Sequence, residues 1–547
     1  MSTPTGSNLP PVLRPARPPR RALGDLAARF GGEVVGDATG VVVTGITLAT
    51  ADLRPGEAFV ALRGVNRHGA ELAQTAVDAG AAAIVTDADG ARLAADAGVP
   101  IVVVDHPRAL LGELSAWVYD TADDIPLTLG TTGTNGKTSV THLLAGILGQ
   151  LGVTAGLSST AERHIAGEVI VSRLTTPEAS EFHALLALMR ERGVEAVAVE
   201  VSAQALSRHR VDGVVFDVAG FTNLSHDHLD DYADMREYFE AKMALFSPER
   251  SRRGVISLDS PFGVEVAARS AVPSVTILTP AIAPDPGAAA DWTVDILDER
   301  QDGTEFALRG PGGRTLTTTV PVIGPHMAAN AGLAIVMLAE AGYAWERLVT
   351  ALDGRRIDAH LPGRTQRVSG DRGPAVYVDF GHTPDAFVKT LAAVRRVTPG
   401  RVVMLFGADG DRDKTKRLDM GRTAIDGSDL LIVTDHHPRF EDADSIRATL
   451  LEGARAAAPD AEILEFSPPE RAIVEAVARV GEGDAILWAG PGHQDYRDIR
   501  GVRTPYSARE LARRALQDAG WPVPEPSWTV PYPADETPLS DPSRDWR

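Results

Sequence analysis

The sequence predicts an α/β protein of three domains. At 547 residues the chain is too long for one hydrophobic core, and typical domain sizes favour three. Short apolar runs alternate with longer helical stretches along most of the chain, which is the pattern of sheets covered by helices. One glycine-rich segment also follows a predicted strand and opens a predicted helix.

The domain limits follow from changes in composition and pattern. We expect a small N-terminal domain over residues 22–125, a central α/β domain over 126–358 and a Rossmann-like domain over 359–520. The proline-rich ends, residues 1–21 and 521–547, are expected to be disordered tails. Strands of the third domain are expected at residues 376–379, 402–406, 430–433 and 486–488.

The composition limits the possible functions. A formal net charge of -20 argues against nucleic-acid binding, which needs clustered Lys and Arg. The absence of cysteine excludes thiolate zinc sites and cysteine nucleophiles, so a metal would need oxygen or imidazole ligands, which favours Mg²⁺. No apolar run is long enough to span a bilayer, so we expect a cytoplasmic protein without stable membrane insertion. We also expect a monomer.

The segment from Gly130 to Thr138, called the phosphate loop below, predicts a nucleotide site. Free backbone amides at a helix start favour phosphate, Lys137 would neutralise the outer phosphates, and the Thr138 hydroxyl could ligate Mg²⁺. The match is imperfect, because Thr131 stands where a P-loop has its first glycine. The residues predicted to bind ATP here are Gly130, Thr132, Gly133, Thr134, Asn135, Gly136, Lys137 and Thr138.

Three other features are ambiguous when taken alone. Glu200 ends an apolar strand beside the phosphate loop and suits either a magnesium ligand or the surface. The segment 222–230, with His226, Asp227, His228 and Asp230, suits either a hard cation or a polar turn. Lys242 reads as a solvent-facing helical lysine.

A resemblance resolves these ambiguities. The segments Thr-Gly-Thr-Asn-Gly-Lys-Thr, Glu-Val-Ser, Thr-Asn-Leu-Ser-His-Asp-His-Leu-Asp and Ala-Lys-Met-Ala-Leu-Phe occur with the order and spacing of the Mur ligases. Residues 202–210, 407–417, 438–439 and 489–496 resemble the branch that adds the third residue of the stem peptide. The resemblance covers residues 22–517, and it implies a UDP-sugar-binding, an ATP-binding and an amino-acid-binding domain.

The resemblance implies an ATP-dependent ligase acting on UDP-N-acetylmuramoyl-L-alanyl-D-glutamate and an amino acid. ATP would phosphorylate the terminal carboxylate, and the amine would attack the acyl phosphate. One Mg²⁺ would be held by Thr138 and Glu200, and a second by Glu200, His228 and Lys242 as a carbamate. The implied catalytic residues are Lys137, Glu200, His228 and Lys242.

The resemblance also implies contacts to both nucleotides. Asn330, Arg364 and Asp379 match contacts to adenine, phosphate and ribose of ATP, although each also suits an ordinary cap or strand end. In the first domain, the Thr50 hydroxyl is the only side-chain group of the family's Asp-Ser-Arg segment that this chain retains. Arg208 stands where many relatives have Gln. The residues implied to contact the UDP-dipeptide are Leu48, Thr50, Thr175, Thr176, Ser202, Arg208 and Arg210.

The implied amino-acid pocket departs from the family pattern. Relatives that use diaminopimelate have Asp-Asn-Pro-Arg, where this chain has His436-His437-Pro438-Arg439, and a family Glu is replaced by Gln494. Losing both acidic side chains removes attraction for a second amine, so we expect a neutral polar residue such as homoserine rather than diaminopimelate or lysine. The pocket residues implied are Arg412, His436, His437, Arg439, Gly490 and Gln494, with Arg412 and Arg439 left to bind carboxylate.

Three alternatives remain open. The chain could be another Mur or folylpolyglutamate-type ligase, although the run 409–417 argues against this. It could be a P-loop NTPase switch in which Lys242 and His228 have no catalytic role, or a degenerate homologue with an altered pocket. A ligase should hydrolyse ATP appreciably only when both acceptor and amino acid are present.

Overall fold

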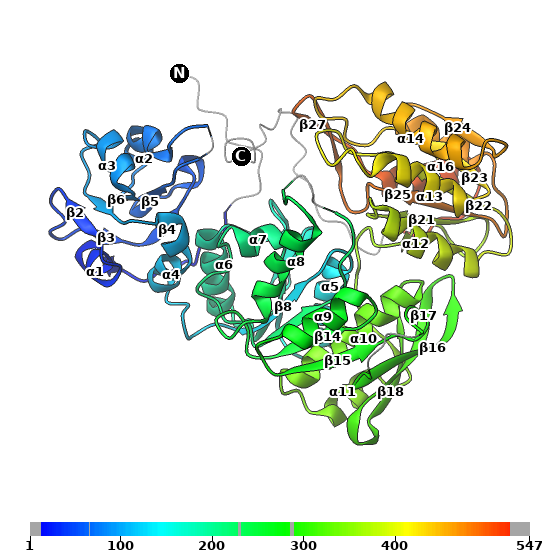
Figure 1. Cartoon of the computed structure of the whole chain (residues 1–547), viewed down its shortest axis with the longest axis horizontal. Helices are drawn as coiled ribbons and strands as arrows, with labels where there is room; N and C mark the ends of the chain where they lie inside the picture. Colours follow the sequence, from blue (N-terminus) through cyan, green and yellow to red (C-terminus); the bar gives the residue numbers. More distant parts are fainter. Residues whose placement is uncertain (1–11, 65, 228–230, 285–288, 526–547) are drawn as a thin grey trace.

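The computed structural model describes residues 12–64, 66–227, 231–284 and 289–525. It contains three α/β domains with separate sheets, seen from blue through green to red in Figure 1. The α/β class and the three-domain arrangement are as the sequence predicts. Within the described ranges, no helix is both long and apolar enough to cross a bilayer.

The first domain has a five-stranded sheet of order β2-β7-β6-β5-β4, in which only β2 runs antiparallel to its neighbour. The domain's strands are β1 (Arg21–Ala22), β2 (Glu33–Val35), β3 (Val42–Val43), β4 (Gly45–Thr47), β5 (Glu57–Ala61), β6 (Ala83–Thr86) and β7 (Ile101–Val103). Its helices are α1 (Leu23–Arg29), α2 (Ala73–Asp78), α3 (Ala88–Leu93) and α4 (Pro107–Tyr119). Pro107 starts α4, where a missing N–H costs nothing, and Asp120 ends it in the left-handed conformation.

The central domain is built on a twelve-stranded sheet that is parallel from β9 to β16. It is antiparallel where β10 and β11 join one side and where β17 and β18 join the other, and β19 at the outer edge runs parallel to β18. The strands are β8 (Leu127–Thr132), β9 (Ala155–Ser158), β10 (Glu162–Ile165), β11 (Glu168–Val171), β12 (Ala196–Glu200), β13 (Val218–Phe221), β14 (Gly254–Ser257), β15 (Ser274–Leu278), β16 (Trp292–Arg300), β17 (Gly303–Arg309), β18 (Thr315–Val320) and β19 (Arg355–Arg356). The helices are α5 (Lys137–Gln150), α6 (Ala179–Glu191), α7 (Ala203–Ser207), α8 (Met235–Met243), α9 (Pro261–Arg269), α10 (Pro325–Glu340) and α11 (Trp345–Leu352). Because β8 and β12 are parallel neighbours, their carboxyl ends place the phosphate loop and Glu200 at one sheet edge.

The third domain has a six-stranded sheet of order β20-β21-β25-β22-β23-β24, parallel except for β20. Its strands are β20 (Gln366–Arg367), β21 (Ala375–Asp379), β22 (Val402–Phe406), β23 (Leu430–Val433), β24 (Ile463–Glu465), β25 (Ala485–Ala489) and the separate hairpin β26 (Tyr496–Ile499) and β27 (Val502–Pro505). Its helices are α12 (Pro384–Arg396), α13 (Arg417–Asp426), α14 (Ala443–Ala457), α15 (Pro469–Val477) and α16 (Ala508–Asp518). All four strands expected in this domain are therefore present.

The described parts of the expected tails pack on the body of the protein. Arg14 is buried and its Nε lies 2.6 Å from the Glu57 carboxylate on β5. At the other end, Trp521 packs against the core beneath β21 and β25, and a side chain at Gly373 would collide with its ring. The expectation of tails over all of residues 1–21 and 521–547 is corrected at these two places, because the buried Arg14 and the half-buried Trp521 hold the adjoining chain.

Candidate active site

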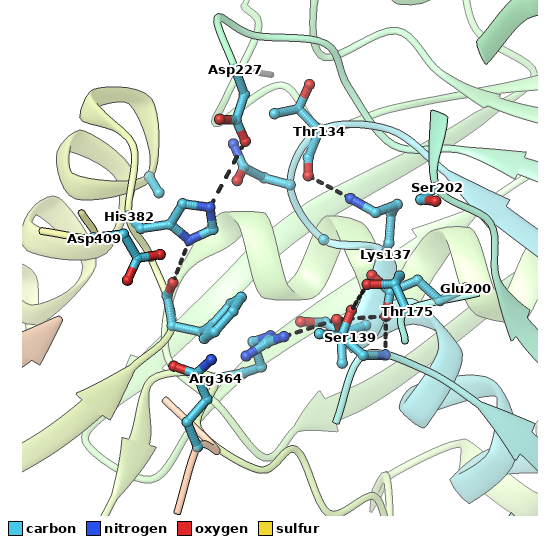
Figure 2. A pocket seen from close by; sticks show the side chains of 18 of the residues that line it. Thr134, Lys137, Ser139, Thr175, Glu200, Ser202, Asp227, Arg364, His382 and Asp409 are labelled. Atoms are coloured by element: carbon cyan, nitrogen blue, oxygen red, sulfur yellow. Dashed lines mark hydrogen bonds and ion pairs between the residues drawn. The ribbon is translucent and has the colours of Figure 1, made fainter. Parts of the chain in front are cut away.

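A cavity of about 650 Å³ lies where the three domains meet (Figure 2). The first domain contributes Leu48 and Arg108 to its wall, the central domain Lys137 and Glu200, and the third domain His436. Residues far apart in the sequence therefore share one chamber large enough for small-molecule substrates.

The phosphate loop joins β8 to α5, as its sequence predicts. Gly133 and Gly136 have φ of 144° and 91°, and a Cβ at Gly136 would lie 2.6 Å from the side-chain oxygen of Asn330. Glycine is therefore required at Gly136 by both backbone conformation and space. The Lys137 ammonium donates to the carbonyl oxygens of Gly133 and Thr134 at 3.1 and 2.8 Å, which holds its charge inside the loop.

Thr138 and Glu200 form a pair at the carboxyl ends of the central strands. The Thr138 hydroxyl donates to Glu200 Oε2 at 2.8 Å, and the backbone N–H of Thr160 donates to the same oxygen at 2.8 Å. Arg364 reaches across from the start of the third domain and donates to the Thr138 hydroxyl at 2.8 Å. A hydroxyl and a carboxylate side by side are the hard oxygen donors that Mg²⁺ prefers, so these residues fit the expected metal.

Lys242 is buried, with 1% of its surface exposed, so the interpretation as a solvent-facing lysine is wrong. Its ammonium donates to the Gly133 carbonyl oxygen at 2.7 Å and lies 4.3 Å from the centre of the Tyr238 ring. Burial, and then the nearby Lys137 cation, lowers the pKa of Lys242 well below its ordinary value. The neutral amine that this favours is the nucleophilic form of lysine.

His228 and Asp230, expected near a metal, lie outside the described residues. The described part of the same segment supports the phosphate loop. The backbone carbonyl of Asn223 accepts from the Thr134 N–H at 2.8 Å. The side-chain oxygen of Asn223 accepts from the Asn135 N–H at 3.0 Å. Asp227 forms an ion pair with Lys416 of the third domain at 3.2 Å.

The three residues expected to contact ATP outside the phosphate loop all line the cavity. Asn330 on α10 faces Gly136, and Arg364 contacts Thr138, so both lie at the phosphate loop. The Asp379 carboxylate at the end of β21 accepts from the backbone N–H groups of Thr365 and Gly381, both at 2.7 Å. Asp379 therefore also has the structural role that its strand-end position suggests.

Five of the seven residues expected at the UDP-dipeptide line the cavity, namely Leu48, Thr175, Ser202, Arg208 and Arg210. Thr50 and Thr176 do not. Thr176 is buried, and its hydroxyl donates to the Glu200 carbonyl at 2.8 Å and accepts from the Ser202 N–H at 3.1 Å. Its contribution is thus to hold two cavity residues in place.

Ion pairs across the junction of the first two domains were not predicted. Arg173 pairs with Asp52 at 2.8 Å, and Glu178 accepts from Arg108 at 2.7 Å and pairs with Arg210 at 2.8 Å. All five line the cavity. Their sequence separations carry no periodic signal, and only Arg210 was identified through the family resemblance.

All six residues expected in the amino-acid pocket line the cavity. His437 is fixed from both sides, because one ring nitrogen lies 2.9 Å from the Gln494 side-chain oxygen and the other accepts from the Asp498 N–H at 3.0 Å. His437 also stacks on Tyr496. Gln494 therefore holds His437, so replacing it would affect more than the charge of the pocket.

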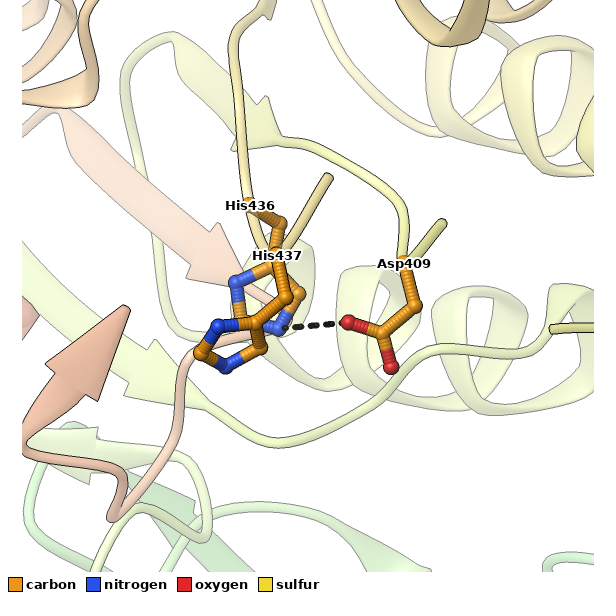
Figure 3. A group of neighbouring side chains, drawn as sticks. All are labelled: Asp409, His436 and His437. Carbon is orange, nitrogen blue, oxygen red and sulfur yellow. Dashed lines mark ion pairs between the residues drawn. The ribbon is translucent and has the colours of Figure 1, made fainter. Parts of the chain in front are cut away.

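Asp409 was not predicted as a pocket residue. It follows β22, lines the cavity, and its Oδ1 lies 3.6 Å from Nε2 of His436 (Figure 3). The expectation about pocket charge considered only positions 436 and 494, whereas a loop distant in sequence also supplies the Asp409 carboxylate to the cavity wall. The segment 409–417 begins with this residue and was already distinguished in the sequence, so its first acidic side chain was a signal that could have identified Asp409.

Asp409, His436 and His437 are close enough to suggest a metal site. Both nitrogens of His437 are already engaged, however, by Gln494 and the Asp498 N–H. Two donors remain, which is fewer than a stable transition-metal site uses. This cluster is therefore described as part of the cavity wall rather than as a metal site.

Three sequence families match consecutive parts of the chain. They are described as Mur ligase family, catalytic domain, over residues 42–119; Mur ligase middle domain, over 131–338; and Mur ligase, glutamate ligase domain, over 363–492. These matches cover parts of the three observed domains in order.

Similar proteins extend over nearly the whole chain. A UDP-N-acetylmuramyl-tripeptide synthetase of Leifsonia xyli subsp. xyli is 57% identical and covers 94% of this chain and 99% of its own. A UDP-N-acetylmuramoyl-L-alanyl-D-glutamate--2,6-diaminopimelate ligase of Streptomyces coelicolor is 41% identical, covering 92% and 98%.

Solved structures agree. A structure of a UDP-N-acetylmuramoyl-L-alanyl-D-glutamate--2,6-diaminopimelate ligase has a TM-score of 0.62 at 25% identity and covers 92% of this chain and 100% of its own. MurF ligase of Thermotoga maritima in complex with ADP shares the fold, with a TM-score of 0.60 at 17% identity and coverage of 87% and 98%. The shared domains, the phosphate loop and the near-complete coverage lead to one conclusion: this chain belongs to the Mur ligase family of ATP-dependent ligases.

Proposed function

We propose that this ligase adds the third amino acid of the stem peptide to UDP-N-acetylmuramoyl-L-alanyl-D-glutamate through an acyl phosphate. The observation that carries the proposal is the shared cavity. It brings the Thr138 and Glu200 pair of the central domain together with Arg108 of the first domain and Arg439 of the third. A nucleotide, an acidic acceptor and an amino acid can thus meet in one chamber.

The chemistry requires two anions to approach each other. A carboxylate oxygen of the acceptor attacks the γ-phosphorus of ATP, and the bond between that phosphorus and ADP breaks. The Lys137 ammonium and the Arg364 guanidinium, both at the phosphate loop, reduce the repulsion between carboxylate and phosphate. Mg²⁺ held by Thr138 and Glu200 would add positive charge against the phosphate oxygens.

The second half of the reaction makes the amide bond. The amine nitrogen of the incoming amino acid attacks the acyl carbon, the carbon–oxygen bond to phosphate breaks, and the amine loses a proton. Arg412 and Arg439 are proposed to hold that amino acid by its carboxylate, because both guanidinium side chains lie in the pocket wall.

Lys242 is proposed to act as a carbamate. Its neutral amine can add to CO₂, forming a nitrogen–carbon bond and releasing a proton, which converts the side chain into an anionic oxygen ligand. Together with Glu200 and His228 it would hold a second Mg²⁺. The proposal is supported by a lysine that is buried at the phosphate loop, where an uncharged or anionic side chain is better accommodated beside Lys137.

The remaining contacts follow the wall of the cavity. We propose that Asn330 and Asp379 contact the adenosine of ATP. Leu48, Thr175, Ser202, Arg208 and Arg210 are proposed to bind the UDP-dipeptide, with Thr50 and Thr176 acting from behind the wall. We also propose a cytoplasmic monomer, and light scattering during gel filtration tests the oligomeric state.

The test is substrate-dependent ATP hydrolysis with product analysis. Purified protein, ATP, Mg²⁺ and the UDP-dipeptide are incubated with a panel of amino acids, and phosphate and product mass are measured. We expect phosphate release only when both acceptor and amino acid are present, with a product heavier by one amino-acid residue. Phosphate release without acceptor would instead support an NTPase switch, and ligation of another acceptor would support a different Mur or folylpolyglutamate-type ligase.

A further inference from the structure

Residues 12–16 lie along the junction of the first two domains, and we call this segment the strap. Arg14 is buried, and its Nε lies 2.6 Å from Oε1 of Glu57 on β5 of the first domain. Val12 is also buried, and its carbonyl oxygen accepts a hydrogen bond from Arg54 of the same domain at 3.3 Å. The strap is therefore fixed to the first domain at two points.

The strap is also fixed to the central domain. Leu13 packs against a core cluster of that domain, which includes Phe182 and Val199. The backbone N–H of Ala16 donates to Oε2 of Glu191 on α6 at 2.7 Å. Contacts to the first domain and to the central domain thus alternate along the strap, so one short segment joins the two domains.

The side chain of Glu57 is placed to receive Arg14. A Cβ at Gly45 on β4 would lie 2.6 Å from Glu57 Oε1, so glycine at this position leaves room for the carboxylate beside the neighbouring strand. The other oxygen, Oε2, accepts from the Arg54 N–H at 3.0 Å. Because Glu57 is buried, loss of the Arg14 guanidinium would leave its charge without a cationic partner at this place.

The strap lies behind the cavity walls of both domains. Leu48, Ala49 and Asp52, in the connection from β4 to β5, line the cavity. On the central-domain side, burial raises the pKa of Glu181, a cavity-lining carboxyl of α6, and the Arg14 cation is among the charges that oppose this rise. These walls form the end of the cavity at which the UDP-dipeptide is proposed to bind.

We infer that the strap fixes the first domain against the central domain, and that Arg14 is a positioning residue for the UDP-dipeptide. The inference rests on the proposed ligase function. The acceptor must reach from the first domain to the Thr138 and Glu200 pair, so a small shift of the first domain would move its carboxylate away from the γ-phosphate. A segment expected to be part of a disordered tail would thus contribute to substrate binding.

Variants of Arg14 test the inference through the KM of each substrate and through the Kd of the UDP-dipeptide, measured by calorimetry without ATP. In Arg14→Ala, the KM and the Kd for the UDP-dipeptide should both rise by about tenfold, the size of one charge-assisted hydrogen bond. The KM for ATP should stay within about twofold of wild type, because the phosphate loop belongs to the central domain, and kcat should change less than the KM for the UDP-dipeptide. Arg14→Lys keeps the charge and should restore part of the affinity.

Two further variants separate positioning from a loss of stability. Arg17→Ala removes an exposed arginine next to the strap and should behave like wild type. Arg14→Ala leaves the buried Glu57 unpaired and is expected to lower the melting temperature, so Arg14→Met combined with Glu57→Gln, which removes both charges, is measured beside it. This double variant should melt near the wild-type temperature and still bind the UDP-dipeptide about tenfold more weakly.

Wild-type affinity for the UDP-dipeptide in any folded variant without the Arg14 charge would overturn the inference. Equal rises in the KM values for ATP, the amino acid and the UDP-dipeptide would overturn it too, because the strap would then only stabilise the fold. If wild-type protein binds the UDP-dipeptide but ligates no amino acid to it, the proposed function fails, while calorimetry still decides the role of Arg14. If wild-type protein does not bind the UDP-dipeptide, both fail.

Discussion

The ammonium of Lys242 donates to the Gly133 carbonyl oxygen at 2.7 Å, which places a buried lysine of α8 directly on the phosphate loop. A charged lysine in this position costs free energy, because burial and Lys137 both oppose its charge. Conversion to a carbamate would remove the cation and supply oxygen ligands at the nucleotide.

Replacing Lys242 by Ala should lower ligation by about 100-fold or more, because an oxygen ligand near the transferred phosphoryl group is lost. Adding a small carboxylate such as acetate should restore part of the activity by occupying the same space. Phosphate release with both substrates present gives the measurement. Undiminished activity in Lys242→Ala would contradict the carbamate role.

The carbamate can also be observed directly. The chain contains five lysines, so protein kept in ¹³C-bicarbonate should give few carbamate resonances by NMR. One resonance should be present in wild-type protein, absent in Lys242→Ala and retained in Lys414→Ala, which changes a lysine that is 66% exposed and pairs with Glu441. A wild-type spectrum without this resonance would rule out the modification under those conditions.

Local sequence was sufficient for some of these features and insufficient for others. The phosphate loop could be predicted because a strand, a glycine turn and a helix start are contiguous in the chain. The third-domain strands could be predicted because buried parallel strands are short apolar runs. Whether Lys242 faces solvent or the phosphate loop depends on how α8 packs against that loop, which helical periodicity alone does not reveal.

Contacts between separate loops were the main failure. Asp409 and His436 follow different strands, and nothing in either segment indicates that the two loops meet. The same is true of Arg173 and Asp52, which come from different domains. An inference about pocket charge drawn from positions 436 and 494 therefore missed the carboxylate that the fold adds.

Glu200→Gln should lower the rate of ligation by about 100-fold or more and raise the Mg²⁺ concentration needed for half-maximal rate. The amide keeps the size of the side chain but removes the negative charge beside the Thr138 hydroxyl, where a magnesium ion would be bound. Phosphate release across a Mg²⁺ titration measures both effects. The control is Glu195→Gln, which changes an exposed carboxylate one residue before the start of β12 and should show the Mg²⁺ dependence of the wild type. If Glu200→Gln also showed the wild-type Mg²⁺ dependence, the metal assignment would be contradicted.

Arg364→Ala should raise the KM for ATP by about tenfold or more. The guanidinium joins the third domain to the phosphate loop through its 2.8 Å hydrogen bond to Thr138, and it stacks over the Phe380 ring at 4.5 Å. Its loss removes a cation from the phosphate site and a link between domains. Initial rates at varied ATP give the measurement. The control is Arg372→Ala, at an exposed position of the same domain. Equal KM values for ATP in the two variants would contradict the role of Arg364 at the phosphate site.

His183 predicts a pH dependence of stability. It is fully buried on α6, its Nε2 donates to the Asp212 carbonyl at 2.9 Å, and its Nδ1 accepts from the Thr121 hydroxyl at 2.7 Å. Burial lowers its pKa from 6.5 to about 4, so the unfolded chain binds a proton more readily than the folded protein between these values. The free energy of unfolding should therefore fall as pH drops from about 6.5 towards 4, and His183 should account for about 2 kcal/mol between pH 6.5 and 5.

Thermal melting at pH 7 and pH 5 separates the contribution of His183 from those of other buried histidines. His183→Gln should be less stable than wild type at pH 7, because its buried hydrogen bonds are disturbed. It should nevertheless lose less stability on acidification, because the side chain that resists protonation is gone. His106→Gln alters an exposed histidine before α4 and should melt like wild type at both pH values. If acidification lowers the melting temperature of His183→Gln as much as that of wild type, the neutral His183 does not contribute to the pH dependence.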